Sequence, residues 1–232
     1  MDPRKLVREF GLDERLSGAG CAYCGGAPET VDHVPSKILL DDPLPDNLPV
    51  VPSCFSCNNG FSSHEEYLAC FIECVVAGTT EHDRLGRAKV QGALRHSPKL
   101  AQLIEASRTK CDERIVWKPD DTRVETVVLK LARGHHLYEL AAPQHEDPVT
   151  LEFLSLIHMS AEERSSFETE PLLRGWPEIG TRSFLRAAGV HPFRSSPDDW
   201  VRVQDGNYRY CVIDGYVRIV LREYLACTVV WE

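Results

Sequence analysis

The sequence predicts an α+β protein: a zinc-bound N-terminal segment of two strands and a helix, a helical connector, and a mixed C-terminal domain with an antiparallel β-meander. Three observations predict this class. Two Cys-x-x-Cys pairs lie near the N-terminus, apolar residues at helical spacing follow the second pair, and strand-like runs broken by Asp-Gly dipeptides close the chain. The segments that we expect are residues 1–77, 78–110 and 111–232.

The length is that of a globular protein, because 232 residues are enough to bury a core. Of the nine cysteines, four belong to the paired motif and the others have no framework spacing. The charged N-terminus lacks the apolar centre of a signal peptide, and no apolar run is long enough to span a bilayer. We therefore expect a cytoplasmic protein without a membrane partner, with free thiols and a metal site rather than disulfides.

The first elements prepare the metal site. Residues 3–16 carry Leu6, Val7, Phe10 and Leu16 at nearly helical spacing, which predicts a short amphipathic helix. Two Cys-x-x-Cys turns follow, each short enough to direct two sulfurs at one point. Four thiolates can surround a tetrahedral Zn²⁺, so the ligands that we expect are Cys21, Cys24, Cys54 and Cys57.

Between the two pairs, apolar residues and prolines predict two short strands around the loop DDPLPDN. Asp32-His33 falls on the first strand, and residues 48–51 form the second. A helix is then expected over Cys57–Val76, with Glu65 and Glu66 near its N-terminal end. The zinc would join the two ends of this segment, and so its binding would be part of folding.

Three polar residues near the cysteines point to a second metal. A carboxylate at Asp32 and an amide oxygen at Asn58 suit Mg²⁺ or Mn²⁺, with water and phosphate oxygens completing the shell. His33 has an imidazole near neutral pKa and is suited to deprotonate a water for attack on phosphorus. Adjacent residues on a strand point to opposite sides, so Asp32 and His33 need a bulge or the strand's end to converge.

The stretches CAYC, TVDHVPSK and DNLPVVPSCFSCNNGFSSHEEYL together resemble the HNH endonuclease family, in its zinc-stapled branch with a ββα-metal motif. The resemblance covers residues 21 to about 68. It implies that Asp32 and Asn58 bind the catalytic metal and that His33 is the general base. It also implies that Asn47 braces the loop between the strands. Phe61 stands where many relatives carry a basic residue, so another cation, such as Lys37 or Arg84, must contact phosphate.

Charge is unevenly distributed along the chain, whose net charge is −9. Residues 84–110 hold seven basic residues and one acidic residue, whereas residues 18–68 hold seven acidic residues and one lysine. A basic helix is expected over Glu81–Arg95 and another over Pro98–Ser107. Either this run is a solvated face, or it binds phosphate beside the metal site. The nucleic-acid-binding residues that we expect are Lys37, Arg84, Arg87, Lys89 and Arg95.

The remaining chain predicts a strand over Arg114–Trp117, a helix over Thr122–Leu140, a strand over Val149–Ile157 and a meander from Trp200 onward. The Asp-Gly-containing breaks at residues 205–207 and 214–215 are hairpin signals. Cys70 and Cys74 are interpreted as buried free cysteines, and His135-His136 as structural histidines.

The resemblance implies metal-dependent hydrolysis of DNA phosphodiesters, with RNA as a further substrate to test. One form of this function is a dormant effector of a phage-defence or restriction system that a partner protein activates. The alternative is a non-catalytic zinc-knot adaptor that docks a protein or nucleic acid. The same cysteines fit both interpretations, so the distinction depends on Asp32, His33 and Asn58.

Overall fold

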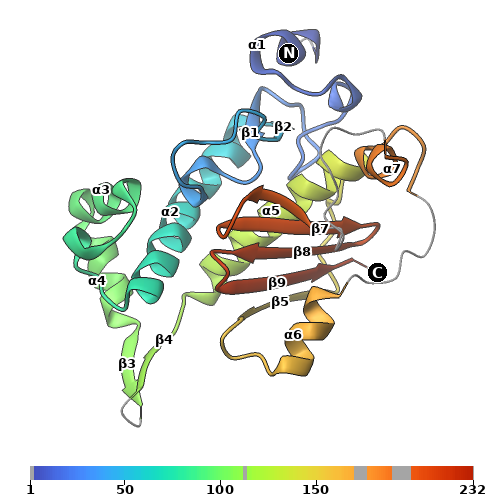
Figure 1. The fold of residues 1–232 in the computed structure, drawn as a ribbon. Coiled ribbons are helices and arrows are strands. Elements are labelled where there is room, and N and C mark those ends of the chain that lie inside the picture. Colours follow the sequence, from blue (N-terminus) through green and yellow to red (C-terminus); the bar gives the residue numbers. More distant parts are fainter. Residues whose placement is uncertain (1–2, 112–113, 170–176, 190–199, 232) are drawn as a thin grey trace. The chain divides into compact units, whose positions relative to one another are not determined.

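A computed structural model describes residues 3–111, 114–169, 177–189 and 200–231 (Figure 1). The fold is mixed α+β. The chain forms two compact units: the sheet unit, residues 1–60 and 128–232, and the helical unit, residues 61–127. Their borders differ from those of the three expected segments, which stay a prediction. No helix in the described part of the chain is both long enough and apolar enough to cross a membrane.

The sheet unit begins with α1 (Pro3–Phe10), which ends where Gly11 adopts a positive φ of 67°. A 3₁₀ helix (Glu14–Leu16) leads to an antiparallel pair, β1 (Thr30–His33) and β2 (Val50–Ser53), in which His33 lies opposite Val50. A second 3₁₀ helix (Lys37–Leu39) lies between the strands. Directly after β2 the chain enters α2 (Phe55–Ala77), so the order strand, strand, helix agrees with the expectation.

A five-stranded antiparallel sheet forms the rest of this unit, in the order β5-β9-β8-β7-β6. The strands are β5 (Thr150–Ser155), β6 (Val201–Gln204), β7 (Tyr208–Ile213), β8 (Tyr216–Leu221) and β9 (Leu225–Val230). The last four strands are the meander that the sequence predicted. Gly206 and Gly215 supply positive φ angles at its first two turns.

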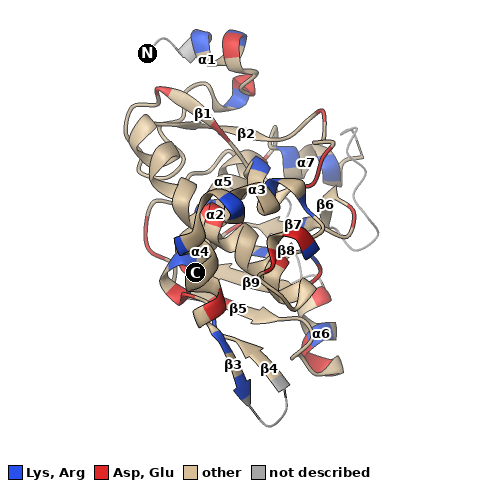
Figure 2. Ribbon diagram, turned by 90° about the vertical axis from the view of Figure 1, so that its left-hand side faces the viewer, with Lys and Arg blue, Asp and Glu red and all other residues tan. Residues whose placement is uncertain are grey.

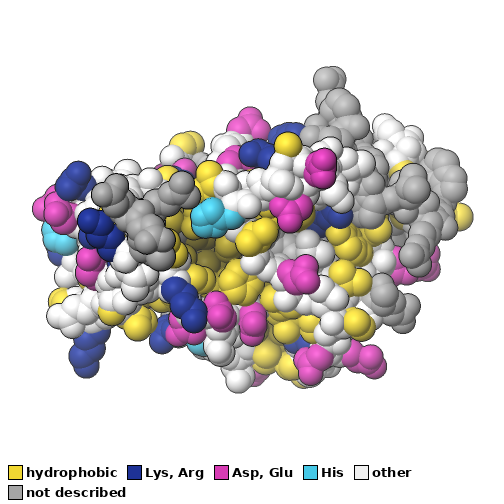
Figure 3. Space-filling view, turned by 90° about the horizontal axis from the view of Figure 1, so that it is seen from below, with side chains coloured by type: hydrophobic (Ala, Val, Ile, Leu, Met, Phe, Trp, Pro, Cys, Tyr) yellow, Lys and Arg dark blue, Asp and Glu magenta, His cyan; other side chains and the backbone are white. Residues whose placement is uncertain are grey.

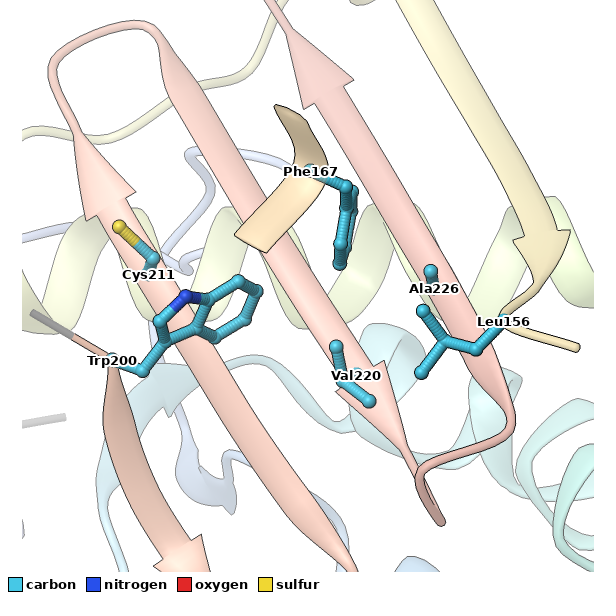
Figure 4. Close-up of a cluster of buried hydrophobic side chains, with 6 residues drawn as sticks. All are labelled: Leu156, Phe167, Trp200, Cys211, Val220 and Ala226. Atoms are coloured by element: carbon cyan, nitrogen blue, oxygen red, sulfur yellow. The ribbon is translucent and has the colours of Figure 1, made fainter. Parts of the chain in front are cut away.

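Side chains alternate between the two faces of this sheet. Tyr208 and Tyr210 contact His135, which belongs to the last part of α5 (Asp121–Leu140). The opposite face carries a separate apolar cluster, to which α6 (Ala161–Glu168) contributes Phe167 (Figure 4). Both faces are therefore covered. The members of the cluster are Leu156, Phe167, Trp200, Cys211, Val220 and Ala226.

The helical unit contains the larger part of α2, then α3 (Ala88–His96), α4 (Pro98–Ala106), β3 (Arg108–Cys111), β4 (Arg114–Trp117) and the start of α5. Its core includes Cys70 and Cys74, which are buried and free, as expected. Burial raises the pKa of each thiol to about 12, which makes both unreactive. Figure 2 shows that Lys and Arg occur on α3, α4 and β3.

Four elements differ from the sequence prediction. A single helix over Glu81–Arg95 was wrong, because the chain is extended at Leu85 between a 3₁₀ helix (His82–Arg84) and α3. There the backbone N–H of Gly86 donates to the Glu73 carboxylate at 3.0 Å, a contact that ties this bend to α2. Strand β3 and helices α6 and α7 (Arg182–Ala187) were not predicted. Helix α6 does carry a sequence signal, the capping box of Ser160 and Glu163.

Candidate metal centre and adjoining β-hairpin

The four paired cysteines converge as the sequence predicted. The sulfurs of Cys21, Cys24, Cys54 and Cys57 all lie within 4.8 Å of one another. With Zn–S bonds of 2.3 Å, a tetrahedral site requires sulfurs about 3.8 Å apart. The Cys24 and Cys54 sulfurs are 3.9 Å apart. The cluster therefore has the size and the thiolate chemistry of a structural zinc site.

Glycines shape the first Cys-x-x-Cys turn. The N–H of Gly25 donates to the carbonyl of Cys21 at 2.9 Å, and Gly25 has a φ of +71° that other residues rarely adopt. A Cβ on Gly20 would lie 2.5 Å from the carbonyl oxygen of Gly25, so that position has no room for a side chain. The N–H of Ala22 donates to the carbonyl of Pro52 in β2 at 2.9 Å. The turn is thus attached to the hairpin that it serves.

The second pair lies where β2 passes into α2. Cys54 precedes the helix, and the N–H of Cys57 approaches the Cys54 sulfur at 3.4 Å. The carboxylate of Glu29 accepts from the N–H of Phe55 at 3.2 Å, a stabilising contact at the positive end of the helix. Both sulfurs of this pair lie within 4.8 Å of the two sulfurs of the first pair.

The surroundings shift the pKa values of Cys21 and Cys57 in opposite directions. Burial raises the pKa of Cys21, but hydrogen bonds from the backbone N–H groups of Cys54, Tyr23 and Cys24 outweigh this effect and lower the pKa to about 7. Burial and the neighbouring thiols raise the pKa of Cys57 well above its usual range. Four adjacent thiolates repel one another, and a divalent cation removes this repulsion.

Asp32 has protein partners on the buried side of β1. Its Oδ2 accepts from the Tyr23 hydroxyl at 2.7 Å and lies 2.8 Å from the ammonium of Lys130. Lys130, in α5, also donates to the Ser36 hydroxyl at 2.7 Å, and its side chain is only 1% exposed. Asp32 is thus neutralised by a buried lysine. A catalytic cation has to bind this carboxylate in the presence of the ammonium group.

His33 ends β1 and is half-buried. His33 pairs with Val50, and the preceding residue, Asp32, pairs with Val51. Because adjacent residues of a strand alternate, the side chains of Asp32 and His33 project from opposite sides of β1. Burial lowers the pKa of His33, the charges of Lys37 and Lys130 lower it further, and Asp32 opposes them. The imidazole is therefore neutral at pH 7, the form that accepts a proton.

The two asparagines occupy different positions. The side-chain amide of Asn58 donates to the carbonyl of Val31 at 3.2 Å, which places Asn58 beside β1. Asn47 is exposed in the loop before β2, where it lines a small cavity of about 50 Å³ together with Leu48 and Tyr210. The structure thus brings Asn58 next to the strand of Asp32 and His33. The bracing role of Asn47 stays a prediction.

The expected nucleic-acid-binding residues have mixed surroundings. Lys37, Arg84 and Arg95 are exposed, and Lys89 is half-buried. Arg87 is only 8% exposed. Arg95 is paired with Asp83 at 2.9 Å and Arg84 with Glu81 at 3.5 Å. Figure 3, a view of one face, shows Lys and Arg interspersed with Asp and Glu rather than gathered into one patch.

Sequence reasoning missed the part of Lys130 in this site. Lys130 lies within the helix predicted from Val124, Val127, Val128 and Leu131, all of which are buried. The lysine directly before Leu131 lies along the apolar stripe of that helix. This position was the only signal in the sequence that the lysine is buried. Its partner Asp32 lies 98 positions earlier, so the pair depends on tertiary structure.

Comparisons with protein-family models, with curated proteins and with solved structures found no match to this chain. The four-cysteine cluster is the part of the HNH resemblance that the structure supports. The nuclease assignment therefore stays a prediction.

Proposed function

We propose that the chain is a metal-dependent endonuclease that hydrolyses phosphodiester bonds of DNA. The observation that carries this proposal is the position of His33. It ends the first strand of a strand–strand–helix segment whose base is a four-cysteine cluster, and its lowered pKa keeps it ready to accept a proton.

In this proposal, His33 removes a proton from a water molecule as that water attacks phosphorus. The bond from phosphorus to the 3′ oxygen breaks, and that oxygen takes a proton from solvent, leaving 5′-phosphate and 3′-hydroxyl ends. Asp32 and Asn58 would hold a Mg²⁺ or Mn²⁺ ion, which would supply stabilisation of the charge that develops on phosphate. Lys37, exposed and four residues after His33, contributes to phosphate binding.

The test is a plasmid-nicking assay with wild-type chain and the His33→Ala variant, with Mg²⁺, with Mn²⁺ and without added divalent ion. We expect His33→Ala to reduce cleavage by at least about a hundredfold, because a positioned general base contributes about 10² to 10⁴. Zinc content and the melting curve should not change. His96→Ala, which removes an exposed histidine, is the control. Cleavage by His33→Ala at the wild-type rate would contradict the assignment.

A second candidate is a non-catalytic zinc-knot adaptor, and one observation favours it. The Asp32 carboxylate is already bonded to Tyr23 and Lys130, which is what a purely structural aspartate requires. The adaptor predicts no nicking with either metal at any protein concentration. A dormant nuclease predicts cleavage only after the product of a neighbouring gene is added, and the same assay separates the two.

A further inference from the structure

Helix α5 carries a second buried cation besides Lys130. The side chain of Arg133 is only 14% exposed, and a guanidinium group keeps its positive charge in a folded protein. Burying a charge is costly unless an opposite charge and hydrogen bonds compensate it. Some group near Arg133 therefore has to compensate its charge.

The hydrogen-bond partners of this guanidinium are neutral carbonyl groups. Its Nη2 donates to the carbonyls of His145 at 3.0 Å and Glu146 at 2.9 Å, and its Nη1 approaches the carbonyl of Tyr23 at 3.5 Å. Its Nε is buried, and no group among the described residues accepts a hydrogen bond from it. Carbonyl groups orient the guanidinium, but they carry no net charge that could offset its own.

Carboxylates contribute little to the compensation. Among the residues that the structure describes, Asp147 is the one carboxylate that forms an ion pair with Arg133, at 3.8 Å. The Asp147 side chain is 99% exposed, so water screens its charge strongly. The main compensating charge has to come from a different kind of group.

Arg133 lies beside the four-cysteine cluster. Tyr23, whose carbonyl it approaches, follows Cys21 by two positions inside the first Cys-x-x-Cys turn. His145, whose carbonyl accepts from Arg133, also places its ring against this turn, with Nε2 3.2 Å from the carbonyl oxygen of Cys21. The guanidinium is therefore attached both to the turn and to the segment that packs on the turn.

A metal-loaded cluster has the charge that the surroundings of Arg133 lack. Four thiolates (−4) and one Zn²⁺ ion (+2) together carry a charge of −2. Burial lowers the pKa of Arg133, whereas the negative charges of Asp147 and Cys57 raise it. The arginine and the cysteines are thus close enough to interact electrostatically.

We propose that Arg133 is a positioning residue of the metal centre, where its buried positive charge stabilises four thiolates around a divalent cation such as Zn²⁺. The inference goes beyond the proposed function, because the same role applies to a nuclease and to an adaptor. In the alternative, Arg133 is purely structural and only joins the first turn to the segment after α5. The two roles differ in whether the charge or the hydrogen bonds of the side chain matter.

The experiment measures the affinity of the full-length chain for Zn²⁺ under reducing conditions, by competition with a chelating indicator. Arg133→Gln removes the charge and keeps a hydrogen-bond donor, whereas Arg133→Lys keeps the charge and changes the hydrogen-bond geometry. Arg218→Gln is the matched control. Arg218 also donates to three backbone carbonyls, but these belong to residues 166, 167 and 169 at the C-terminal end of α6.

We expect Arg133→Gln to weaken Zn²⁺ binding about 10- to 100-fold, the range typical of groups that support metal ligands. Arg133→Lys should stay within about threefold of the wild-type chain, because it supplies the same charge. Arg218→Gln should stay within about twofold, because a charge far from the centre is screened. The absorption spectrum of the Co²⁺-loaded chain, which reports the ligand set, should be the same in all variants.

Two results would overturn the inference. One is a folded Arg133→Gln variant that binds Zn²⁺ as tightly as the wild-type chain. The other is an equal loss of affinity in Arg133→Lys and Arg133→Gln, which would show that the hydrogen bonds matter and the charge does not. If Arg133→Gln does not fold, Arg133→Lys decides: retained affinity supports the inference, and a loss of about tenfold or more overturns it. None of these results depends on the plasmid-nicking assay.

Discussion

At the scale of single residues, Asp32 and Lys130 form a buried ion pair beside the four-cysteine cluster. Both are buried, with side chains 10% and 1% exposed, and their charged atoms are 2.8 Å apart. The ammonium lies 5.8 Å from the centre of the Tyr23 ring, which adds a weaker attraction. A buried ion pair contributes little net stability, but removing one partner is costly because the other charge stays buried.

We therefore predict that Lys130→Met lowers the free energy of unfolding by about 3 to 5 kcal/mol, because it leaves the Asp32 carboxylate buried without its cation. Urea denaturation followed by circular dichroism measures this. The double variant Asp32→Asn with Lys130→Met should recover part of the loss, since it removes both charges. Lys37→Met, at an exposed lysine of the same unit, should change stability by less than about 0.5 kcal/mol. A stable Lys130→Met single variant would show that the pair does not hold the strand.

At the scale of elements, the four cysteines join the first turn, the hairpin and the start of α2. Cys54→Ser removes one of four ligands. We expect bound zinc, measured by elemental analysis, to fall below one equivalent, and the melting temperature to fall by about 6 to 12 °C, which corresponds to about 3 kcal/mol for a chain of this size.

Cys74→Ala is the matched control for that prediction. It removes a buried cysteine of α2 that lies outside the cluster. Its stability should decrease through lost packing alone, and its zinc content should not change. Full zinc occupancy and unchanged melting in Cys54→Ser would contradict the four-cysteine site.

At the scale of the whole molecule, the packing of α5 on the five-stranded sheet makes stability depend on pH. His135 is fully buried, stacks on Tyr210 at 3.7 Å between ring centroids and contacts the Tyr208 hydroxyl at 2.7 Å. Burial lowers the pKa of His135 well below its usual range, and the charge of Lys130 adds to this. His135 is therefore neutral in the folded protein.

In the unfolded chain a histidine has a pKa near 6.5, so below that pH the unfolded state binds a proton that the folded state does not. The contribution of His135 to the free energy of unfolding is fully present above pH 6.5. It decreases as the pH falls below that value, by up to about 1.4 kcal/mol per pH unit. Urea unfolding at pH 8, 6 and 5 measures the slope. His135→Gln should reduce it by that amount. The measurement at pH 8 is the control, because the histidine is neutral there in both the folded and the unfolded state. If the slope at low pH were the same in His135→Gln as in the wild-type chain, the prediction would be wrong.

Local signals determined much of this molecule. The two Cys-x-x-Cys turns, the strand-like runs around Asp32-His33 and the Asp-Gly breaks of the meander each depend on a few neighbouring residues. For that reason the four-cysteine cluster, the order strand–strand–helix and the antiparallel sheet could all be predicted. Strand β3 was missed because RTKC has no apolar alternation, and it becomes a strand only through its pairing with β4.

The sequence by itself therefore determined which four cysteines come together as a possible metal site. Only the tertiary structure decided what surrounds them. Lys130 reaches Asp32 from a distant helix, and Arg87 becomes buried although it belongs to the basic run of residues 84–110. The physical reason is that ion pairing and burial depend on contacts between segments far apart in the chain, about which local periodicity and spacing carry no information.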